Sequence, residues 1–208
     1  MKTDAAMQAA VYRRFGAPEV VTVADVPRPV PQGDQVLIRV HAATVGIVDS
    51  LARRGSPAYA RVQFGLRRPR FPILGSDFAG QVEAAGPAVT RFAEGDQVFG
   101  TVAPHFGAHA QYVCLSEQAA VAAMPAGLSY ADAAALADTT ALCFMRDKAN
   151  LRRGQTVLIN GASGAVGSTA VQLAMHSPAA APAMTNQRVT YSPNLEITRP
   201  NTITTWTR

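Results

Sequence analysis

Three glycines, each separated from the next by two residues, are the feature of the sequence that most suggests chemistry. They occur in the run Gly161-Ala162-Ser163-Gly164-Ala165-Val166-Gly167. Glycines in such a pattern let a backbone turn tightly and approach a ligand closely. If a helix follows the turn, its unpaired N–H groups and the positive end of its dipole attract anions. The run therefore predicts a site for phosphate groups, to which the Ser163 hydroxyl adds a donor.

The segments on either side of the run support this interpretation. The segment before it, Thr156–Ile159, is short and apolar, as buried parallel strands are. The segment after it, Val166–Met175, places its apolar side chains on one face of a helix. A strand, a glycine turn and a helix in this order are typical of a dinucleotide-binding fold. The alternative is that the glycines only allow the strand and the helix to pack closely, and the context favours the nucleotide site.

One expected part of a dinucleotide site is missing from the sequence. An acid that binds the ribose is expected about 20 residues further on, at the end of the next strand. Residues 178–195 contain no Asp or Glu, and Arg188 is the one cation among them. We interpret Arg188 as a surface residue of a tail with no sustained periodicity, in which at most residues 188–191 and 195–198 form short strands.

The sequence up to residue 125 is predicted to form short strands separated by turns. Residues 36–43 alternate most clearly, with Val36, Ile38 and Val40 on one face and Arg39 and His41 on the other. Further candidate strands are residues 80–84, 97–99 and 109–114. Many short strands at this spacing favour a barrel-like β domain.

The pattern becomes helical after Pro125. Ser129 followed by Asp132 predicts a helix N-terminus, with a capping side chain and an acid in the first turn. An alanine-rich helical stretch is expected from Tyr130 to about Lys148.

The composition, with 48% hydrophobic and 16% charged residues, favours a globular protein. The presence of two isolated cysteines favours a reducing compartment. Cys114 and Cys143 belong to no CxxC or Cys/His cluster, which argues against a disulfide framework and a structural zinc site. The N-terminus lacks the apolar segment of a signal peptide, and no apolar run approaches the length of a membrane span. We therefore expect a cytoplasmic protein with no membrane association.

The net charge is +5, and part of the excess is concentrated in one stretch. Such a stretch can attract phosphates or acidic partners. No aromatic interleaving and no known nucleic-acid motif accompany it. We interpret it as a solvated loop and expect no nucleic-acid partner. Its members are Arg53, Arg54, Arg61, Arg67, Arg68 and Arg70.

Several motifs in a fixed order resemble the medium-chain dehydrogenase/reductase superfamily, in its zinc-free quinone oxidoreductase-like branch. The resemblance covers roughly residues 7–175. The matching segments are Met7–Tyr12, Gly16–Val20, Gln35–Val40, Gly65–Pro69, Pro72–Gly80, Gly95–Gly100 and Val157–Asn160 with the glycine run after it.

This resemblance implies a β + α/β fold, in which a GroES-like β barrel is followed by the start of a Rossmann domain. The corresponding ranges are 1–126 for the barrel domain, 127–176 for a partial NAD(P)-binding segment, and 177–208 for an atypical, poorly structured tail. A full member continues much further, so the Rossmann domain is expected to be incomplete. The change of character after Met175 is interpreted as a frameshift or a truncated gene.

The family implies reduction of quinones or related enones and carbonyls, by hydride transfer from NADPH or NADH. No catalytic residue is identified. Thr140 is implied to lie near the nicotinamide, and its alternative is a helical threonine bonded to its own backbone. The residues implied to bind the pyrophosphate are Asn160, Gly161, Ala162, Ser163, Gly164, Ala165 and Val166.

The same resemblance argues against a metal. Zinc-dependent relatives have a Gly-His-Glu segment where this sequence has Gly75-Ser76-Asp77, and serine is not a usual zinc ligand. No cysteine occurs near residues 44–49, and we expect His41, His105 and His109 to be ordinary histidines. Gly46 replaces a family asparagine that helps to hold the nicotinamide ribose. Asp49 is retained, and it either orients groups in the cleft or caps a local turn.

Two functional hypotheses remain from the sequence. The first is a reductase of the quinone oxidoreductase type, impaired by truncation. The second is a non-catalytic remnant of the barrel domain, or a binding module without a cofactor. A lone strand–helix pair leaves an apolar sheet edge exposed, which predicts a homodimer or aggregation through that edge.

Overall fold

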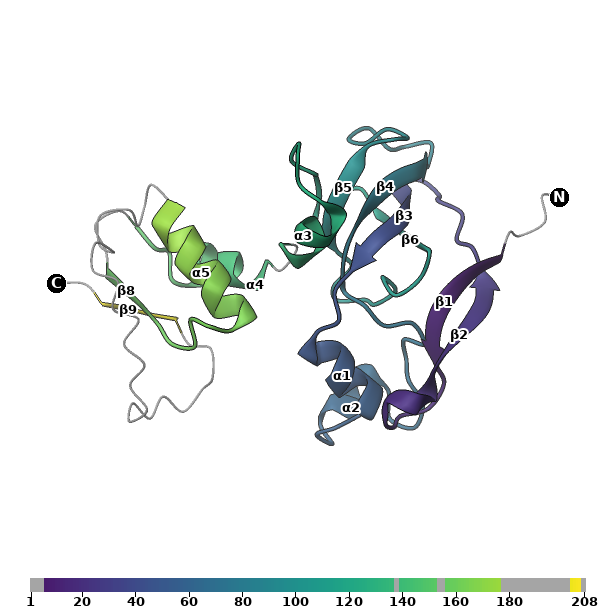
Figure 1. Cartoon of the computed structure of the whole chain (residues 1–208), viewed down its shortest axis with the longest axis horizontal. Helices are drawn as coiled ribbons and strands as arrows, with labels where there is room; N and C mark the ends of the chain where they lie inside the picture. The colour runs from purple at the N-terminus through teal and green to yellow at the C-terminus, as the bar shows by residue number, and fades with distance from the viewer. Residues whose placement is uncertain (1–5, 137–138, 153–155, 177–202, 207–208) are drawn as a thin grey trace. The chain divides into compact units, whose positions relative to one another are not determined.

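The computed structural model describes residues 6–136, 139–152, 156–176 and 203–206. The chain divides into two compact units, Met1–Ala137 and Asp138–Arg208, and Figure 1 labels most of their elements. Unit 1 contains most of the strands, whereas unit 2 contains the glycine run. The domain ranges given from the sequence stay predictions.

Unit 1 is built on a five-stranded antiparallel sheet with the strand order β6-β3-β4-β5-β7. A second, two-stranded sheet pairs β1 (Ala6–Tyr12) with β2 (Val21–Pro27), and the 3-10 turn η1 (Pro18–Val20) lies between them. Single bridges, Ala9 with Ala110 and Val11 with Ile73, connect β1 to the rest of the unit. The predicted β domain is thus confirmed, with its strands in two linked sheets. The strands of the larger sheet are β3 (Gln35–Ala43), β4 (Asp77–Ala85), β5 (Gln97–Thr101), β6 (Tyr112–Ser116) and β7 (Val121–Ala123).

The alternation predicted for residues 36–43 is confirmed in β3. Val36 and Ile38 are fully buried, whereas Arg39 and His41 are exposed. Leu37 is also buried, because the pairing of β3 with β4 shifts register between Leu37 and Ile38. Such an irregularity turns neighbouring side chains to the same side. The core of this sheet consists of Val36, Ile38, Phe78, Val82, Val98, Val102, Ala108, Val113, Leu115 and Val121.

The strand predicted over residues 109–114 begins later, since β6 starts at Tyr112. The three residues before it pair with other strands instead. The N–H of Ala10 donates to the carbonyl of His109 at 2.9 Å, and the N–H of Val40 donates to the carbonyl of Gln111 at 2.9 Å. This segment therefore ties β1 to the end of β3, a long-range pairing that local alternation does not reveal.

Two short helices of unit 1 were not predicted from the sequence. The first, α1 (Ile47–Arg54), ends at Gly55, whose φ of +59° is in the left-handed region that favours glycine. The second, α2 (Ala60–Phe64), follows closely. Both helices contribute to a second core, which consists of Tyr12, Ala52, Phe64 and Leu74.

The helix predicted to start after Ser129 is confirmed as α3 (Tyr130–Ala135). The Ser129 hydroxyl accepts the N–H of Asp132 at 3.2 Å, as the capping pattern predicts. The prediction of one helix as far as Lys148 was wrong. A separate turn, α4 (Thr140–Leu142), is followed by a π-helix, η2 (Cys143–Lys148). The two residues before α4 in the sequence, Asp138 and Thr139, have low helix propensity.

Unit 2 contains the predicted strand and helix, β8 (Thr156–Ile159) and α5 (Ala165–His176). Ala141 and Met145 pack against Ala170 and Ala174 of α5, so α4 and η2 cover one side of that helix. The neighbour of β8 is antiparallel, where the sequence had suggested a parallel strand. It is β9 (Ile203–Trp206), which was not predicted. The short strands suggested at 188–191 and 195–198 lie outside the described residues.

Candidate functional site

The glycine run forms an exposed turn between β8 and α5. Gly161 has a φ of +75°, in the left-handed region, and its carbonyl accepts the N–H of Gly164 at 2.9 Å. The N–H of Ser168 then donates to the carbonyl of Gly164 at 2.8 Å, which closes the first helical turn. The strand–turn–helix arrangement predicted from the sequence is therefore present.

Gly167 shows why the last glycine of the run is needed. A Cβ atom at this position would lie 2.1 Å from the carbonyl oxygen of Gly161, far inside van der Waals contact. Only glycine allows the first turn of α5 to approach the end of β8 this closely. This is the helix–strand packing role of the third glycine in a dinucleotide fingerprint.

The turn is open to solvent and has no acid near it in sequence. Asn160, Gly161, Ser163 and Gly164 are all exposed. No Asp or Glu occurs between Asp147 and Glu196. The first N–H groups of a helix have no partner within the helix. A helix N-terminus with these properties suits a bound anion such as a diphosphate.

The structure brings together seven of the eight predicted cofactor-binding residues, Asn160 to Val166, in this one turn. The eighth, Thr140, is the exposed first residue of α4. Its neighbour Ala141 packs against Ala170 of α5, so α4 is attached to the helix that begins at the turn. The contact of any of these residues with a cofactor stays a prediction.

In unit 1, Asp49 is a buried acid that connects two segments of the chain. It is 4% exposed, and its two carboxylate oxygens bind different segments. Oδ2 accepts the N–H of Gly46 at 2.8 Å, and Oδ1 accepts the N–H of Gly75 at 2.8 Å. The local cap suggested by the sequence is confirmed. The bond to Gly75, which nothing in the sequence indicated, also holds residues 46–49 against residues 74–77.

The same carboxylate affects a buried tyrosine. Tyr12 is 1% exposed in the second core of unit 1. Burial and the nearby charge of Asp49 raise the pKa of Tyr12 to about 12. Both effects disfavour the tyrosinate anion. Tyr12 therefore remains neutral throughout the physiological range, as a core residue rather than an acid or base.

The segment Gly75-Ser76-Asp77, discussed above in relation to zinc, forms hydrogen bonds within the protein. Asp77 Oδ2 accepts the hydroxyl of Ser76 at 3.0 Å and the hydroxyl of Thr44 at 3.2 Å. His109 Nε2 lies 2.8 Å from the carbonyl of Thr44. In the part of the chain that the structure describes, no three His, Cys, Asp or Glu side chains gather as metal ligands would.

The other two histidines of this part of the sequence also have partners. His41 stacks on the ring of Tyr130 with centroids 4.4 Å apart. His105 meets the ring of Phe71 at 5.9 Å, in an edge-to-face arrangement. Such contacts fit the sequence interpretation of these side chains as ordinary histidines.

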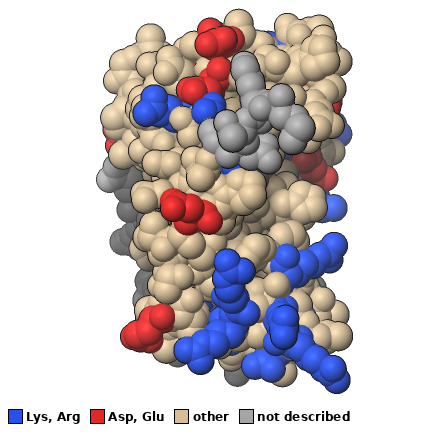
Figure 2. All heavy atoms as spheres, turned by 90° about the vertical axis from the view of Figure 1, so that its right-hand side faces the viewer, with Lys and Arg blue, Asp and Glu red and all other residues tan. Residues whose placement is uncertain are grey.

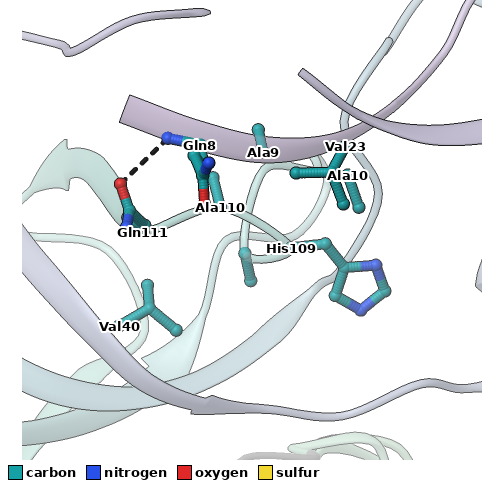
Figure 3. A pocket seen from close by; sticks show the side chains of 9 residues that line it. Gln8, Ala9, Ala10, Val23, Val40, His109, Ala110 and Gln111 are labelled. Carbon is teal, nitrogen blue, oxygen red and sulfur yellow. Dashed lines mark hydrogen bonds between the residues drawn. The ribbon is translucent and has the colours of Figure 1, made fainter. Parts of the chain in front are cut away.

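A shallow pocket of about 310 Å³ lies where β1 meets residues 108–111 (Figure 3). Its lining consists mainly of alanine and valine side chains, with Gln8, Gln111 and His109 as its polar members. The N–H of Gln8 donates to the Gln111 side chain at 2.9 Å, so part of the polar lining is already paired. The pocket contains no acid or other charged side chain, and it does not resemble a catalytic centre.

None of the helices among the described residues is long and apolar enough to cross a membrane.

The fold and the turn together define a class of protein. A GroES-like β domain is followed by a strand, a glycine turn and a helix of the nucleotide-binding type. The family model of the alcohol dehydrogenase GroES-like domain matches residues 32–127.

Known proteins agree with this class. Quinone oxidoreductase from Sus scrofa is 38% identical over 165 residues, which is 77% of this chain and 47% of the relative. The structure of the quinone oxidoreductase from Coxiella burnetii has a TM-score of 0.71 at 32% identity, covering 84% of this chain and 55% of that one. An alcohol dehydrogenase superfamily protein from Novosphingobium aromaticivorans has a TM-score of 0.72 at 34% identity, covering 81% and 50%.

The chain belongs to the medium-chain dehydrogenase/reductase superfamily, among its quinone oxidoreductase-like members. It spans about half the length of the curated relatives that it matches.

Proposed function

We propose that the chain belongs to an NAD(P)H-dependent oxidoreductase of the quinone oxidoreductase type, and that the turn at 160–166 binds the cofactor diphosphate. The observation that carries the proposal is the exposed turn in which Gly167 allows β8 and α5 to approach closely, with no acid nearby in sequence. The names of the relatives support the substrate class, a quinone or a related enone or carbonyl.

The residues present fit such a cofactor. The turn would hold the two phosphates with the N–H groups at the start of α5, and the Ser163 hydroxyl would donate to a phosphate oxygen. Thr140 would contribute from α4, toward the nicotinamide end. When bound, the cofactor supplies the hydride, whereas the protein binds it, orients it and excludes water.

The direct test is binding of NADPH and of NADH to the full chain, followed by nucleotide fluorescence. We expect saturable binding in the micromolar range or tighter, and the ratio of the two affinities identifies the preferred cofactor. Absence of saturable binding to either nucleotide would contradict the proposal. It would favour the alternative, a binding module that uses no cofactor.

A charge placed in the turn tests its role specifically. Ser163→Asp adds a carboxylate where the phosphates would lie, so we expect NADPH affinity to fall roughly tenfold or more. The matched control is Gln172→Glu, which adds the same charge at an exposed position two turns along α5. Equal affinities of the two variants would place the nucleotide elsewhere.

A further inference from the structure

The positive charge of the chain is concentrated at one end of unit 1. The net charge of the chain is +5, and residues 50–76 carry six arginines and no acid, so the remainder has a net charge of −1. Figure 2 shows Lys and Arg side chains gathered on the lower part of the face that it draws, and α1 and α2 lie at the lower end of unit 1 in Figure 1. Arg13 and Arg14 are also exposed, and the neighbouring Phe15 packs against Arg61.

A loop at this end is held closed at its base. The N–H of Arg70 donates to the carbonyl of Phe64 at 2.7 Å, and the N–H of Gly65 donates to the carbonyl of Arg61 at 2.9 Å. Gly65 has a φ of +119°, and a Cβ atom there would lie 2.0 Å from the carbonyl oxygen of Arg68. These contacts fix the conformation of the loop, in which Leu66, Arg67 and Arg68 are exposed.

Apolar side chains are exposed beside these arginines. Phe64 anchors α2 in the second core of unit 1, where it is 7% exposed. On the outer side, Tyr59 is 76% exposed, Val62 is 77% exposed, and Leu66 in the loop is 71% exposed. Tyr59 and Val62 lie three residues apart and therefore project in similar directions. We call this set, Tyr59, Val62, Leu66, Arg67 and Arg68, the basic-apolar tip.

The combination of side chains identifies the kind of partner. Arginines alone would suit any polyanion, including nucleic acid. Exposed valine and leucine side chains, however, find no partner on phosphates or on stacked bases, which prefer aromatic side chains. An anionic lipid surface suits both, because headgroups attract the arginines and the acyl boundary accepts the apolar side chains.

We propose that the basic-apolar tip docks on a membrane surface that contains anionic phospholipid, with Leu66 and Val62 inserted between the headgroups. The surface supplies opposite charge to a segment that has no acid and in which five of the six arginines are exposed; Arg53 is buried and bonded to the carbonyl of Gly16. The inference replaces the expectation of no membrane association, which considered only signal peptides and membrane-spanning segments. It goes beyond the proposed oxidoreductase function and does not depend on it, since the proposed nucleotide site is in unit 2.

The first test is sedimentation of the full chain with vesicles of phosphatidylcholine, with and without phosphatidylglycerol. Binding is expected only with the anionic lipid, and it should weaken as salt is raised because the charges become screened. Equal binding to both vesicle types, or binding to neither, would overturn the proposal.

The second test removes charge from the tip. Near an anionic surface each arginine contributes about fivefold to partitioning, so Arg67→Gln with Arg68→Gln should weaken binding roughly 20-fold to 30-fold. The matched control is Arg39→Gln with Lys148→Gln, which removes the same charge from exposed positions outside the tip. If the control weakens binding equally, net charge alone acts and the tip is not the docking site.

The third test removes the apolar contribution. Leu66→Gln with Val62→Gln should weaken vesicle binding roughly tenfold without changing its salt dependence. Val30→Gln is the control, because Val30 is 68% exposed outside the tip.

Binding to duplex DNA tests the remaining alternative, which is that the tip is a nucleic-acid site. If DNA binds more tightly than the vesicles and the Leu66 variant leaves binding to both unchanged, the tip is a nucleic-acid site and the lipid proposal is wrong.

Discussion

Loops in the two units differ in whether a buried carboxylate accepts their backbone N–H groups. In unit 1, the buried carboxylate of Asp49 accepts the N–H groups of Gly46 and Gly75, both at 2.8 Å. Glu117, 3% exposed, does the same for Thr90 and Arg91. In unit 2, the turn at 160–164 is largely exposed, and no acid occurs between Asp147 and Glu196.

This difference in partners distinguishes loops with a structural role from a candidate binding site. An N–H group that already has a carboxylate partner gains nothing from an added anion, whereas an open one does. The carboxylates of unit 1 therefore fix its loops, and the open turn of unit 2 is where a phosphate gains most. The same chemical group has a structural role in one region and, in our proposal, a binding role in the other.

The largest expected effect is a loss of stability of unit 1, and it tests whether the two units are stabilised independently. Phe78 is fully buried at the centre of the five-stranded sheet. Phe78→Ala should reduce the free energy of unfolding by about 3–5 kcal/mol through lost burial and a residual cavity. Urea unfolding followed by circular dichroism measures it.

Trp206, the one tryptophan of the chain, lies in β9 and reports on unit 2 by fluorescence. If the Trp206 transition keeps its midpoint in the Phe78 variant, the two units unfold independently. Phe144→Ala is the control, since that ring is 41% exposed and its loss should cost far less. An equally large effect of the Phe144 change would show that the core of unit 1 is not the main source of stability.

The carboxylate link of unit 1 comes next in expected size. Asp49→Ala leaves the buried N–H of Gly75 without its acceptor, and a buried unpaired donor costs about 1–3 kcal/mol, whereas the N–H of the exposed Gly46 can bond to water. We expect a loss of about 1–3 kcal/mol in the free energy of unfolding. Asp25→Ala, at an exposed position, should change little. Similar midpoints for the two variants in urea unfolding would remove Asp49 from the scaffold.

Asp49 also illustrates how far the sequence could be interpreted. Its position three residues after Gly46 suggested a local cap, and the structure confirms one. Its bond to Gly75 joins residues 26 positions apart, and no local pattern encodes such a contact. The helix α1 that it caps was missed for a related reason, because eight residues between two glycines resemble a loop as much as a helix.

The turn of unit 2 was easier to predict than the buried acids of unit 1. Its strand, glycines and helix are consecutive, so their spacing alone specifies the arrangement. Glu117, by contrast, stands between Ser116 and Gln118 with nothing to mark it as buried. Its partners, Thr90 and Arg91, are brought to it only by the fold. Local signals thus revealed the candidate site, whereas the scaffold's polar links depend on long-range topology.

Gly167 offers a test on the side of unit 2. Gly167→Ala places a Cβ atom about where the Gly161 carbonyl stands, so α5 must move away from the turn. Overpacking of this kind costs about 1–3 kcal/mol. The Trp206 fluorescence transition should shift to lower urea, while the circular dichroism transition of unit 1 stays unchanged. Gly164→Ala, whose nearest contact would be 3.4 Å, is the milder control.

The smallest expected effect concerns the pH dependence that Glu117 confers on unit 1. The N–H groups of Arg91 and Thr90 hold the pKa of Glu117 below its usual value. A carboxyl with a lowered pKa in the folded state stabilises the fold above its unfolded pKa of about 4.3, and that contribution is lost as pH falls through the folded value.

Glu117→Gln keeps the shape and one acceptor oxygen but removes this titration. The variant should therefore be less stable than the parent near neutral pH, and the difference should shrink as the pH is lowered below 4.3 or so. Urea midpoints measured across that range check it. A difference that stayed constant with pH would mean that the carboxylate charge contributes nothing, and that the neutral amide serves Thr90 and Arg91 as an acceptor in the same way.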